Sequence, residues 1–287
     1  MPDKQRTLAR RTKTLAGIGL HGGRKAAVMI EPAPAGTGIV FRRAELPGQP
    51  LIPARPEFIV KSDRCTVIGR QGLEVRVVEH VIAALVLAGA DNAIVNVMSD
   101  EVPGMDGSAR PFLAAISAEG LVELDRDREP AVLAGPVTLA GEGKAAWSIA
   151  AEPAEGLCVT FRFSGPGSLD GVEVSWKPGD ETEPVAGART FCFEREIKAL
   201  RAAGLGKGGD AGNVLVLGDD GSFLNAARFA DEPAWHKLLD LIGDLGLLGR
   251  LPSARITASG SGHSANADFI RTLAAKINEP EVPQAHA

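Results

Sequence analysis

This 287-residue sequence is poor in cysteine and has no excess of basic residues. Its three cysteines, Cys65, Cys158 and Cys192, are widely spaced and odd in number. They therefore match neither a disulfide framework nor a zinc-knuckle pattern. Lys and Arg total 31 against 36 Asp and Glu, a formal net charge of −5, so composition offers no electrostatic argument for a nucleic-acid partner. Tyrosine is absent, and no function follows from that.

Long apolar segments are also missing. The longest helix-like apolar run, Val81 to Ala90, is too short to span a bilayer. A signal peptide would need an apolar run of roughly 7–15 residues after a basic cluster. No such run follows the N-terminal basic residues, which are Lys4, Arg6, Arg10, Arg11 and Lys13. We therefore expect a cytoplasmic protein without a transmembrane segment.

The apolar content of 45% is ample for packed cores, and its periodicity predicts several strands followed by helices in each half. Strands grouped before helices favour the α+β class over alternating βαβ units. The charged segment 125–130 (DRDREP) is typical of a turn at a domain boundary. Predicted strands cover 25–31, 39–42, 64–68, 73–77, 93–98, 131–139, 146–150, 157–163, 172–176, 213–217 and 255–257. Predicted helices cover 79–87, 110–119, 193–203, 233–248 and 266–277.

One predicted helix carries an unusual polar stripe. Within residues 231–249 (DEPAWHKLLDLIGDLGLLG), His236, Asp240 and Asp244 recur every four residues and so share one helix face. A histidine and an aspartate at this spacing can bind one divalent ion, and the second aspartate could orient a catalytic partner. The alternative is an ordinary amphipathic helix whose polar face happens to carry these groups.

Four more residues outside this helix are chemically suggestive. His80 begins an apolar helix and is a natural zinc ligand, and the neighbouring Glu79 could accept a proton from water. His263 lies in a glycine-rich segment, where it could approach a ligand, and Thr190 could bind an oxyanion. The alternatives are a satisfied buried histidine, a surface loop histidine and a helix-capping threonine.

Taken together, these segments resemble the UDP-3-O-acyl-N-acetylglucosamine deacetylase family, which are zinc enzymes of lipid A biosynthesis. The matching segments occur in the order of the family, between about residues 12 and 273. They are 14–43 (TLAGIGLHGGRKAAVMIEPAPAGTGIVFRR), 78–85 (VEHVIAAL), 101–112 (EVPGMDGSARPF), 187–191 (GARTF), 231–249 and 262–266 (GHSAN).

The resemblance implies a catalytic metal site. It assigns one Zn²⁺ per chain to the ligands His80, His236 and Asp240, and it assigns the general base to Glu79. Three nitrogen and oxygen ligands leave a fourth zinc position open, which is the mark of a catalytic rather than a structural site.

The resemblance also implies the residues around that metal. His263 matches the protonated histidine of the family, with Asp244 as its carboxylate partner, and Thr190 matches the oxyanion-stabilising threonine. The substrate-binding positions fall on Lys237, Phe191 and His21.

By the same resemblance, the reaction is hydrolysis of the N-acetyl group of UDP-3-O-acyl-N-acetylglucosamine, which yields acetate and a free amine and commits the substrate to lipid A. The implied fold has two similar domains, 1–126 and 127–278, each a β-sheet with two helices, with the helices sandwiched between the sheets. We further expect a monomer and a disordered tail at 279–287.

Two positions depart from the family pattern. Gly260 stands where the family usually has a lysine, and Cys192 stands where GARTF is usually followed by glycine. These departures keep two alternatives open. One is a related zinc amidohydrolase acting on another N-acetyl sugar, and the other is a non-catalytic paralogue that binds a nucleotide sugar.

Overall fold

The computed structural model describes residues 3–129, 131–142 and 146–278. Over these residues the chain forms a mixture of α-helices and several β-sheets, which confirms the predicted α+β class. No helix within the described ranges is long and apolar enough to cross a membrane. The predicted tail at 279–287 lies outside the described residues.

The first half of the chain contributes a five-stranded sheet, a three-stranded sheet and an outer two-stranded pair. The five-stranded sheet has the order β2-β3-β9-β4-β5, in which only β4 and β9 are parallel. Its strands are β2 (Leu15–Ile18), β3 (Lys25–Pro32), β4 (Ile39–Arg43), β5 (Leu51–Pro53) and β9 (Ala93–Val97). The three-stranded sheet joins β6 (Ile59–Lys61), β7 (Val67–Arg70) and β8 (Leu73–Arg76), and the outer pair joins β1 (Lys4–Leu8) to β10 (Leu121–Asp127).

The second half contributes a seven-stranded sheet and a small parallel pair. Strand β18 (Pro252–Ser259) lies at the centre of the large sheet and pairs with β13, β14 and β11. The other strands of this sheet are β11 (Ala131–Leu133), β12 (Val137–Gly141), β13 (Trp147–Pro153), β14 (Cys158–Arg162), β15 (Glu173–Trp176) and β19 (Ile277–Asn278). The parallel pair is β16 (Phe191–Phe193) with β17 (Leu215–Leu217).

Two of the helices are largely buried but differ in the polarity of their buried residues. Helix α1 (Glu79–Ala88) is apolar after its first turn, and every residue from Glu79 to Val86 is buried. It ends at Gly89, whose positive φ of 79° is the left-handed conformation that glycine adopts at low cost. Helix α5 (Glu232–Gly246) has Pro233 in its first turn and is buried on nearly all sides, including its polar stripe. The remaining helices are α2 (Arg110–Glu119), α3 (Glu183–Gly187), α4 (Glu194–Ala202), α6 (His263–Ala274) and the short 3₁₀ turns Pro56–Phe58 and Gly167–Leu169.

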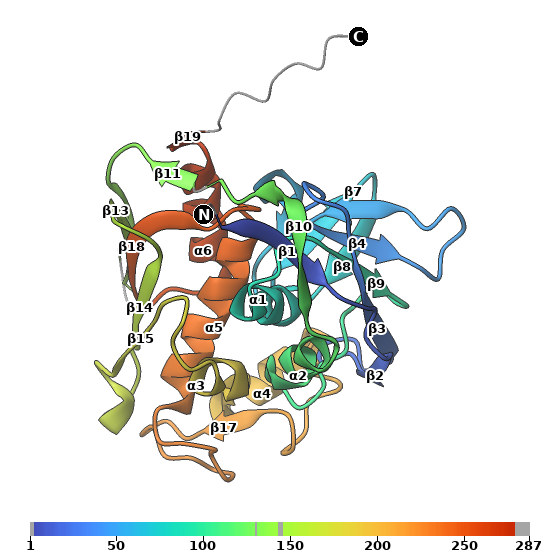
Figure 1. The fold of residues 1–287 in the computed structure, drawn as a ribbon. Coiled ribbons are helices and arrows are strands. Elements are labelled where there is room, and N and C mark those ends of the chain that lie inside the picture. Colours follow the sequence, from blue (N-terminus) through green and yellow to red (C-terminus); the bar gives the residue numbers. More distant parts are fainter. Residues whose placement is uncertain (1–2, 130, 143–145, 279–287) are drawn as a thin grey trace.

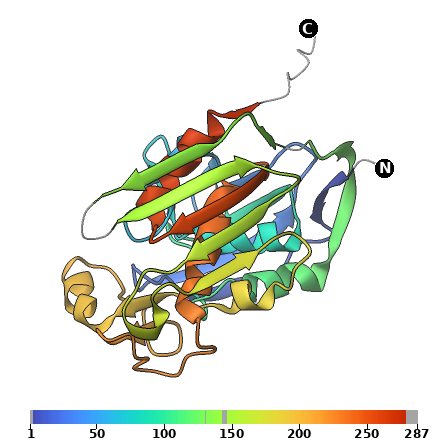
Figure 2. The same cartoon turned by 90° about the vertical axis from the view of Figure 1, so that its left-hand side faces the viewer.

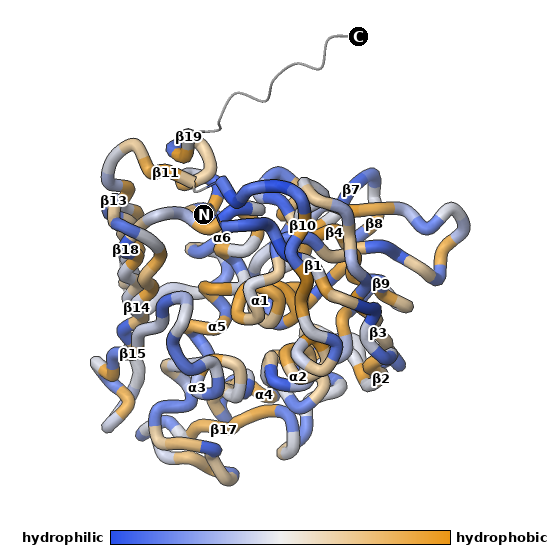
Figure 3. The backbone as a smooth tube through the Cα atoms, viewed as in Figure 1, coloured by the Kyte–Doolittle hydropathy of each residue, from blue (hydrophilic) through white to orange (hydrophobic). Residues whose placement is uncertain are grey.

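Helices α1 and α5 lie side by side in the middle of the molecule (Figure 1). The sheet containing β3 and β9 lies to one side of them and the sheet containing β13 and β18 to the other. Figure 2 views the seven-stranded sheet face-on, with α5 and α6 behind it. In Figure 3 the apolar colour is concentrated on α1, while β1 carries much of the hydrophilic colour. The central helix pair therefore belongs to the core that both large sheets cover.

Four predicted elements differ from the structure. Residues 131–139 form two strands, β11 and β12, instead of one, because Gly135 and Pro136 interrupt the chain between them. Residues 64–66 form a turn before β7 instead of a strand, because the amide of Thr66 donates to the carboxylate of Glu79. Residues 125–127 continue β10 instead of forming a turn, since β10 pairs with β1 on an exposed surface that tolerates charges, with Lys4 bonded to Asp127. Helix α6 begins at His263, three residues before the predicted start, so His263 is a helical residue.

Candidate functional site

The close approach of α1 and α5 positions the candidate site. Gly243 of α5 faces the first turn of α1, and a methyl group in its place would lie 2.9 Å from the carbonyl carbon of Glu79. Ordinary van der Waals contacts between carbon atoms are about 3.5–4.0 Å. The absence of a side chain at Gly243 therefore lets the beginning of α1 lie directly against the middle of α5.

Three buried side chains from these two helices converge on one point. His80 comes from the first turn of α1, and His236 and Asp240 come from consecutive turns of α5. Asp240 Oδ1 lies 3.4 Å from His236 Nε2 and 3.8 Å from His80 Nε2. One ligand atom from each residue lies within 4.8 Å of the others. The predicted ligand set thus forms a group that could hold a metal ion.

The chemistry of this group fits a metal ion. Asp240 Oδ1 is buried and has no hydrogen-bond partner among the described residues, which is costly for a carboxylate oxygen unless a cation neutralises it. His236 Nδ1 donates to the carbonyl oxygen of Ala188 at 3.1 Å, which leaves Nε2 with its lone pair towards Asp240. Two imidazole nitrogens and a carboxylate oxygen are ligands that zinc accepts.

Electrostatics keeps His236 and Asp240 in the forms that bind a metal. Burial lowers the pKa of His236 to about 4, although Asp240 acts in the opposite direction, so its imidazole is neutral near pH 7. Burial opposes ionisation of Asp240, but His236, Lys237 and His263 outweigh burial and hold its pKa well below the ordinary value. Neutral imidazole and ionised carboxylate are the forms that donate an electron pair to a metal.

Glu79 is a buried carboxylate beside the metal-ligand group. Burial raises its pKa above the ordinary value, and the cationic His263 opposes this rise. Its Oε2 accepts a hydrogen bond of 3.1 Å from the amide of Thr66. A carboxylate with a raised pKa, held in place by one amide, is suited to accept a proton near neutral pH.

His263 reaches the same site from the first turn of α6. Its Nε2 lies 3.7 Å from Asp240 Oδ2, and its Nδ1 lies 3.7 Å from Asp244 Oδ2. Burial lowers the pKa of His263, but Asp240, Asp244 and Glu79 together raise it to about 9. The imidazole is therefore cationic at neutral pH and is surrounded by three carboxylates.

Thr66 and Asn266 hold Asp244, and neither was among the predicted site residues. Thr66 Oγ1 donates to Asp244 Oδ1 at 2.6 Å, and Asn266 Nδ2 donates to Asp244 Oδ2 at 2.9 Å. Asn266 Oδ1 in turn accepts from Ser261 Oγ at 3.0 Å. Asn266 belongs to the GHSAN segment and could have been suspected from it. Thr66 carries no such signal, because it lies in a stretch that was predicted to be a strand.

Phe191 and Lys237 border the group, and Thr190 directly precedes Phe191 in the chain. Thr190 follows Ala188 by two residues, and its backbone is fixed by bonds to Gly107 and Leu215. The Phe191 ring lies 6.1 Å from the His236 ring, nearly perpendicular to it. Lys237 Nζ donates to Asp240 Oδ2 at 2.9 Å, so the same carboxylate that could bind a metal also neutralises this lysine.

His21 is buried in a glycine-rich turn. Glu101 holds this turn, since its carboxylate oxygens accept from the amides of His21 at 2.6 Å and Gly22 at 2.8 Å. Burial lowers the pKa of His21, opposed by Glu101, and the charge of His263 lowers it further. Within the described residues His21 shares no hydrogen bond or ion pair with the ligand group. For Thr190, too, the described residues show only backbone bonds. The structure thus brings together the other predicted site residues, which are Glu79, His80, Phe191, His236, Lys237, Asp240, Asp244 and His263.

A buried ion pair supports the segment that contacts His236. Arg189 Nε donates to Glu232 Oε1 at 2.8 Å and its Nη2 donates to Oε2 at 3.1 Å, and neither residue is exposed to solvent appreciably. The amide of Arg189 donates to the same carboxylate. Glu232 opens α5 and Arg189 follows Ala188, so this pair fixes the Ala188 carbonyl relative to α5. Neither residue of this pair was among the predicted site residues.

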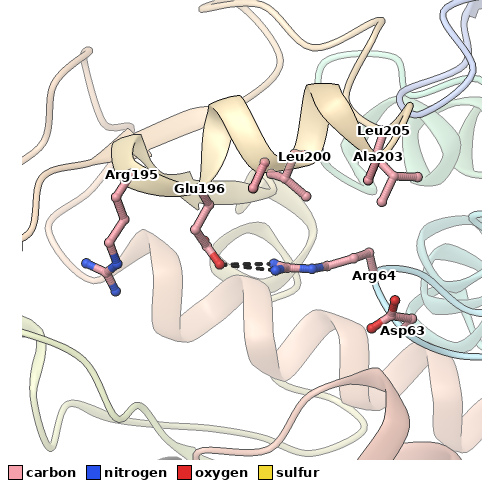
Figure 4. Close-up of a pocket in the computed structure, with 8 residues that line it drawn as sticks. Asp63, Arg64, Arg195, Glu196, Leu200, Ala203 and Leu205 are labelled. Carbon is pink, nitrogen blue, oxygen red and sulfur yellow. Dashed lines mark hydrogen bonds and ion pairs between the residues drawn. The ribbon is translucent and has the colours of Figure 1, made fainter.

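A cavity of about 520 Å³ lies beside the site, between residues 63–64 and α4. Figure 4 shows Arg64 reaching across it to Glu196, with both terminal nitrogens of the guanidinium 3.2 Å from Oε1. Its other lining residues are Asp63, Arg195, Ala199, Leu200, Ala203 and Leu205. Arg64 precedes Thr66 by two residues, so this cavity adjoins the turn that supports Glu79.

Comparison with known proteins gives one consistent family. The family model described as UDP-3-O-acyl N-acetylglycosamine deacetylase matches residues 5–275. The UDP-3-O-acyl-N-acetylglucosamine deacetylase of Thermosynechococcus vestitus is 41% identical over 271 residues, which cover 94% of each chain. The enzyme of that name from Hahella chejuensis is 37% identical, covering 97% of this chain and 93% of the relative. The one from Aquifex aeolicus is 36% identical, covering 91% and 89%.

Proposed function

The chain belongs to the UDP-3-O-acyl N-acetylglycosamine deacetylase family, and we propose that it hydrolyses the N-acetyl group of UDP-3-O-acyl-N-acetylglucosamine at the site described above. The products are UDP-3-O-acyl-glucosamine and acetate, a step of lipid A biosynthesis. One observation carries the assignment to this site. Three donors from two helices meet at a point where the buried Asp240 Oδ1 lacks a partner among the described residues.

His80, His236 and Asp240 hold one zinc ion in this proposal. When bound, zinc supplies Lewis acidity, which polarises an amide carbonyl and makes water more acidic. The donor set supports zinc because it combines two imidazoles with one carboxylate. The bond from His236 Nδ1 to the Ala188 carbonyl orients the ring towards the ion, the kind of support that metal-binding histidines usually have.

Glu79 acts as the general base in this proposal. Its carboxylate takes a proton from the attacking water, and the Thr66 amide holds it in the required orientation. Burial supports this role, because the raised pKa of Glu79 brings its basicity closer to neutral pH.

His263, Asp244 and Thr190 deal with the charges that develop. His263 is cationic, faces the ligand group through Nε2 and can donate a proton from that atom to the leaving amine. Asp244 holds the other side of the ring and stabilises its charge. The Thr190 hydroxyl donates a hydrogen bond to the oxyanion. In hydrolases a contact of this kind stabilises the transition state by about 3–4 kcal/mol.

The substrate contacts are proposed at Lys237, Phe191 and His21. Lys237 offers an ammonium group to substrate oxygen or phosphate, and Phe191 offers an apolar wall beside His236. His21 presents its imidazole from the glycine-rich turn held by Glu101. Among the described residues, neither Gly260 nor Cys192 forms a hydrogen bond with the proposed catalytic groups, so we assign these departures to substrate recognition rather than to the reaction type.

We also propose that the two sheets mark two domains, 1–126 and 127–278, each contributing helices to the layer between them. Because α1 supplies one metal ligand and α5 supplies two, the reaction then depends on contact between the domains. A monomer in the cytoplasm is the state in which we expect the enzyme to act.

The test measures zinc content and acetate release from UDP-3-O-acyl-N-acetylglucosamine for the wild type and for His236→Ala. We expect about one zinc per wild-type chain and loss of both zinc and activity in the variant. A wild type that binds the nucleotide sugar without releasing acetate would instead favour the non-catalytic paralogue. Release of acetate only from a sugar without the acyl chain would favour the related amidohydrolase.

A further inference from the structure

Thr66 is a buried residue that contacts both the proposed base and the partner of the proposed acid. Its amide donates to Glu79 Oε2 at 3.1 Å, and its hydroxyl donates to Asp244 Oδ1 at 2.6 Å. Its Oγ1 also lies 3.5 Å from His263 Nδ1. The residue is 1% exposed, so water does not compete for these bonds. Thr66 thus joins three groups that come from α1, α5 and α6.

The bonding capacity of the hydroxyl fixes the direction of these bonds. A threonine hydroxyl has one hydrogen to donate. Ionised Asp244 can only accept, so that hydrogen is committed to its Oδ1. Towards His263 the hydroxyl is therefore an acceptor, and it faces a ring nitrogen that carries hydrogen when the imidazole is cationic. The His263 Nδ1–H then lies between two acceptors, Thr66 Oγ1 and Asp244 Oδ2.

The opposite side of Asp244 is held independently. Asn266 donates to Oδ2, and Ser261 donates to the amide oxygen of Asn266. Thr66 holds the other oxygen, Oδ1, so the two donors together fix the orientation of the carboxylate. Thr66 is also the member of this network that belongs to the first half of the chain, so it sets Asp244 relative to Glu79.

We propose that Thr66 is a positioning residue for the deacetylation: its hydroxyl fixes Asp244 beneath His263 while its amide fixes Glu79. This inference rests on the proposed function. Thr66 shares no hydrogen bond with His80, His236 or Asp240 among the described residues, so its removal leaves the metal ligands in place. Its loss therefore acts on turnover and leaves zinc binding and substrate affinity largely unchanged.

The experiment compares Thr66→Val, Thr66→Ser and Thr7→Val in the full-length zinc-loaded protein. Thr66→Val keeps the shape and the amide and replaces the hydroxyl by a methyl group, whereas Thr66→Ser keeps the hydroxyl. Thr7 is the matched control, because it is also buried and its hydroxyl donates to Asn92 O at 2.7 Å and accepts from Ala33 N at 2.9 Å, away from the site.

We expect Thr66→Val to lower kcat about 10- to 100-fold, the usual effect of misplacing catalytic groups by a fraction of an ångström to an ångström. KM should stay within about twofold, and zinc content should stay at the wild-type level. Thr66→Ser should recover kcat to within about threefold of the wild type, because it restores the bond to Asp244. Thr7→Val should leave kcat unchanged even if its melting temperature falls as much as that of Thr66→Val.

Wild-type kcat in Thr66→Val would overturn the proposal, and so would a Thr66→Ser variant as slow as Thr66→Val, which would assign the effect to packing. If Thr66→Val does not fold, Thr66→Ala carries the same test, because it removes the hydroxyl without placing a methyl group against the carboxylate. An inactive wild type would instead contradict the proposed function, so the two failures are distinguishable.

Discussion

The two halves of the chain contribute to the site in different ways. The second half supplies His236, Asp240 and Asp244 from successive turns of a single helix, α5. The first half supplies Glu79 and His80 from the opening turn of α1, a helix that is otherwise apolar and buried. Residues four apart on one helix keep their relation wherever the helix packs. The distance and orientation between α1 and α5 are not set by spacing within one helix and depend on how the two helices pack.

Part of the site geometry is therefore encoded locally, and part depends on tertiary packing. The spacing within α5 is a property of the sequence, whereas the position of Glu79 relative to α5 depends on Gly243 and on Thr66. We therefore expect substitutions at Glu79 and at Thr66, which are not metal ligands, to separate metal binding from turnover. Substitutions that remove a ligand from α5 should abolish both.

The largest effect is expected from Glu79→Gln. The variant keeps an acceptor oxygen for the Thr66 amide but cannot accept a proton from water, so kcat should fall about 10²- to 10⁴-fold. Zinc content should remain that of the wild type, because Glu79 is not one of the three converging donors. Steady-state kinetics with metal analysis on the same samples measures both. Turnover within about threefold of the wild type would remove Glu79 from the role of base.

A smaller effect is expected in the pH dependence of stability of the metal-free protein. His263 has a pKa of about 9 in the folded chain, above an unfolded value near 6.5. A group whose pKa is raised by folding stabilises the fold below its unfolded pKa, and this stabilisation disappears as pH rises through the folded pKa. The shift corresponds to about 3 kcal/mol, so the free energy of unfolding should fall by about that amount between pH 6.5 and 10.

His263→Gln is the control for this pH effect, since glutamine does not titrate. Urea denaturation at several pH values should give a flatter profile for the variant than for the wild type. Parallel profiles for the two proteins would mean that the three surrounding carboxylates do not hold His263 in the cationic form.

The sequence predicted the α+β class and the positions of α1, α2 and α5 closely, because their apolar periodicity and glycine ends are local signals. It missed β1, β2, β5, β6, β10, α3, β16 and β19, most of which are short. The candidate site was read from spacing and from resemblance, and the structure brings those donors together. The sequence did not predict the roles of Thr66 and of the Arg189–Glu232 pair. A single threonine in a turn and an ion pair between distant residues produce no recognisable spacing in the sequence.

The smallest effect is expected from substituting two glycines of α5, Gly243 and Gly246. These substitutions also compare the two halves of the site most directly. A methyl group at Gly243 would overlap the backbone of Glu79, whereas one at Gly246 would meet the side-chain methyl groups of Ile82 and Val86. Both Gly→Ala variants gain helix propensity and both crowd α1, at a cost of about 1–3 kcal/mol. Side chains can rotate away from the crowding at Gly246, but the Glu79 backbone can only move with the whole first turn of α1.

Gly243→Ala should therefore displace His80 and weaken zinc binding about 10- to 100-fold, because ligands tolerate displacements of only about 0.5 Å. Gly246→Ala should bind zinc as the wild type does. Competition with a chelator on folded apoprotein measures this affinity without relying on activity, and thermal melts report the stability of each variant. Equal zinc affinities in both variants would mean that α1 adjusts freely. The site would then depend on the α5 stripe alone, and the contrast between the two halves would be lost.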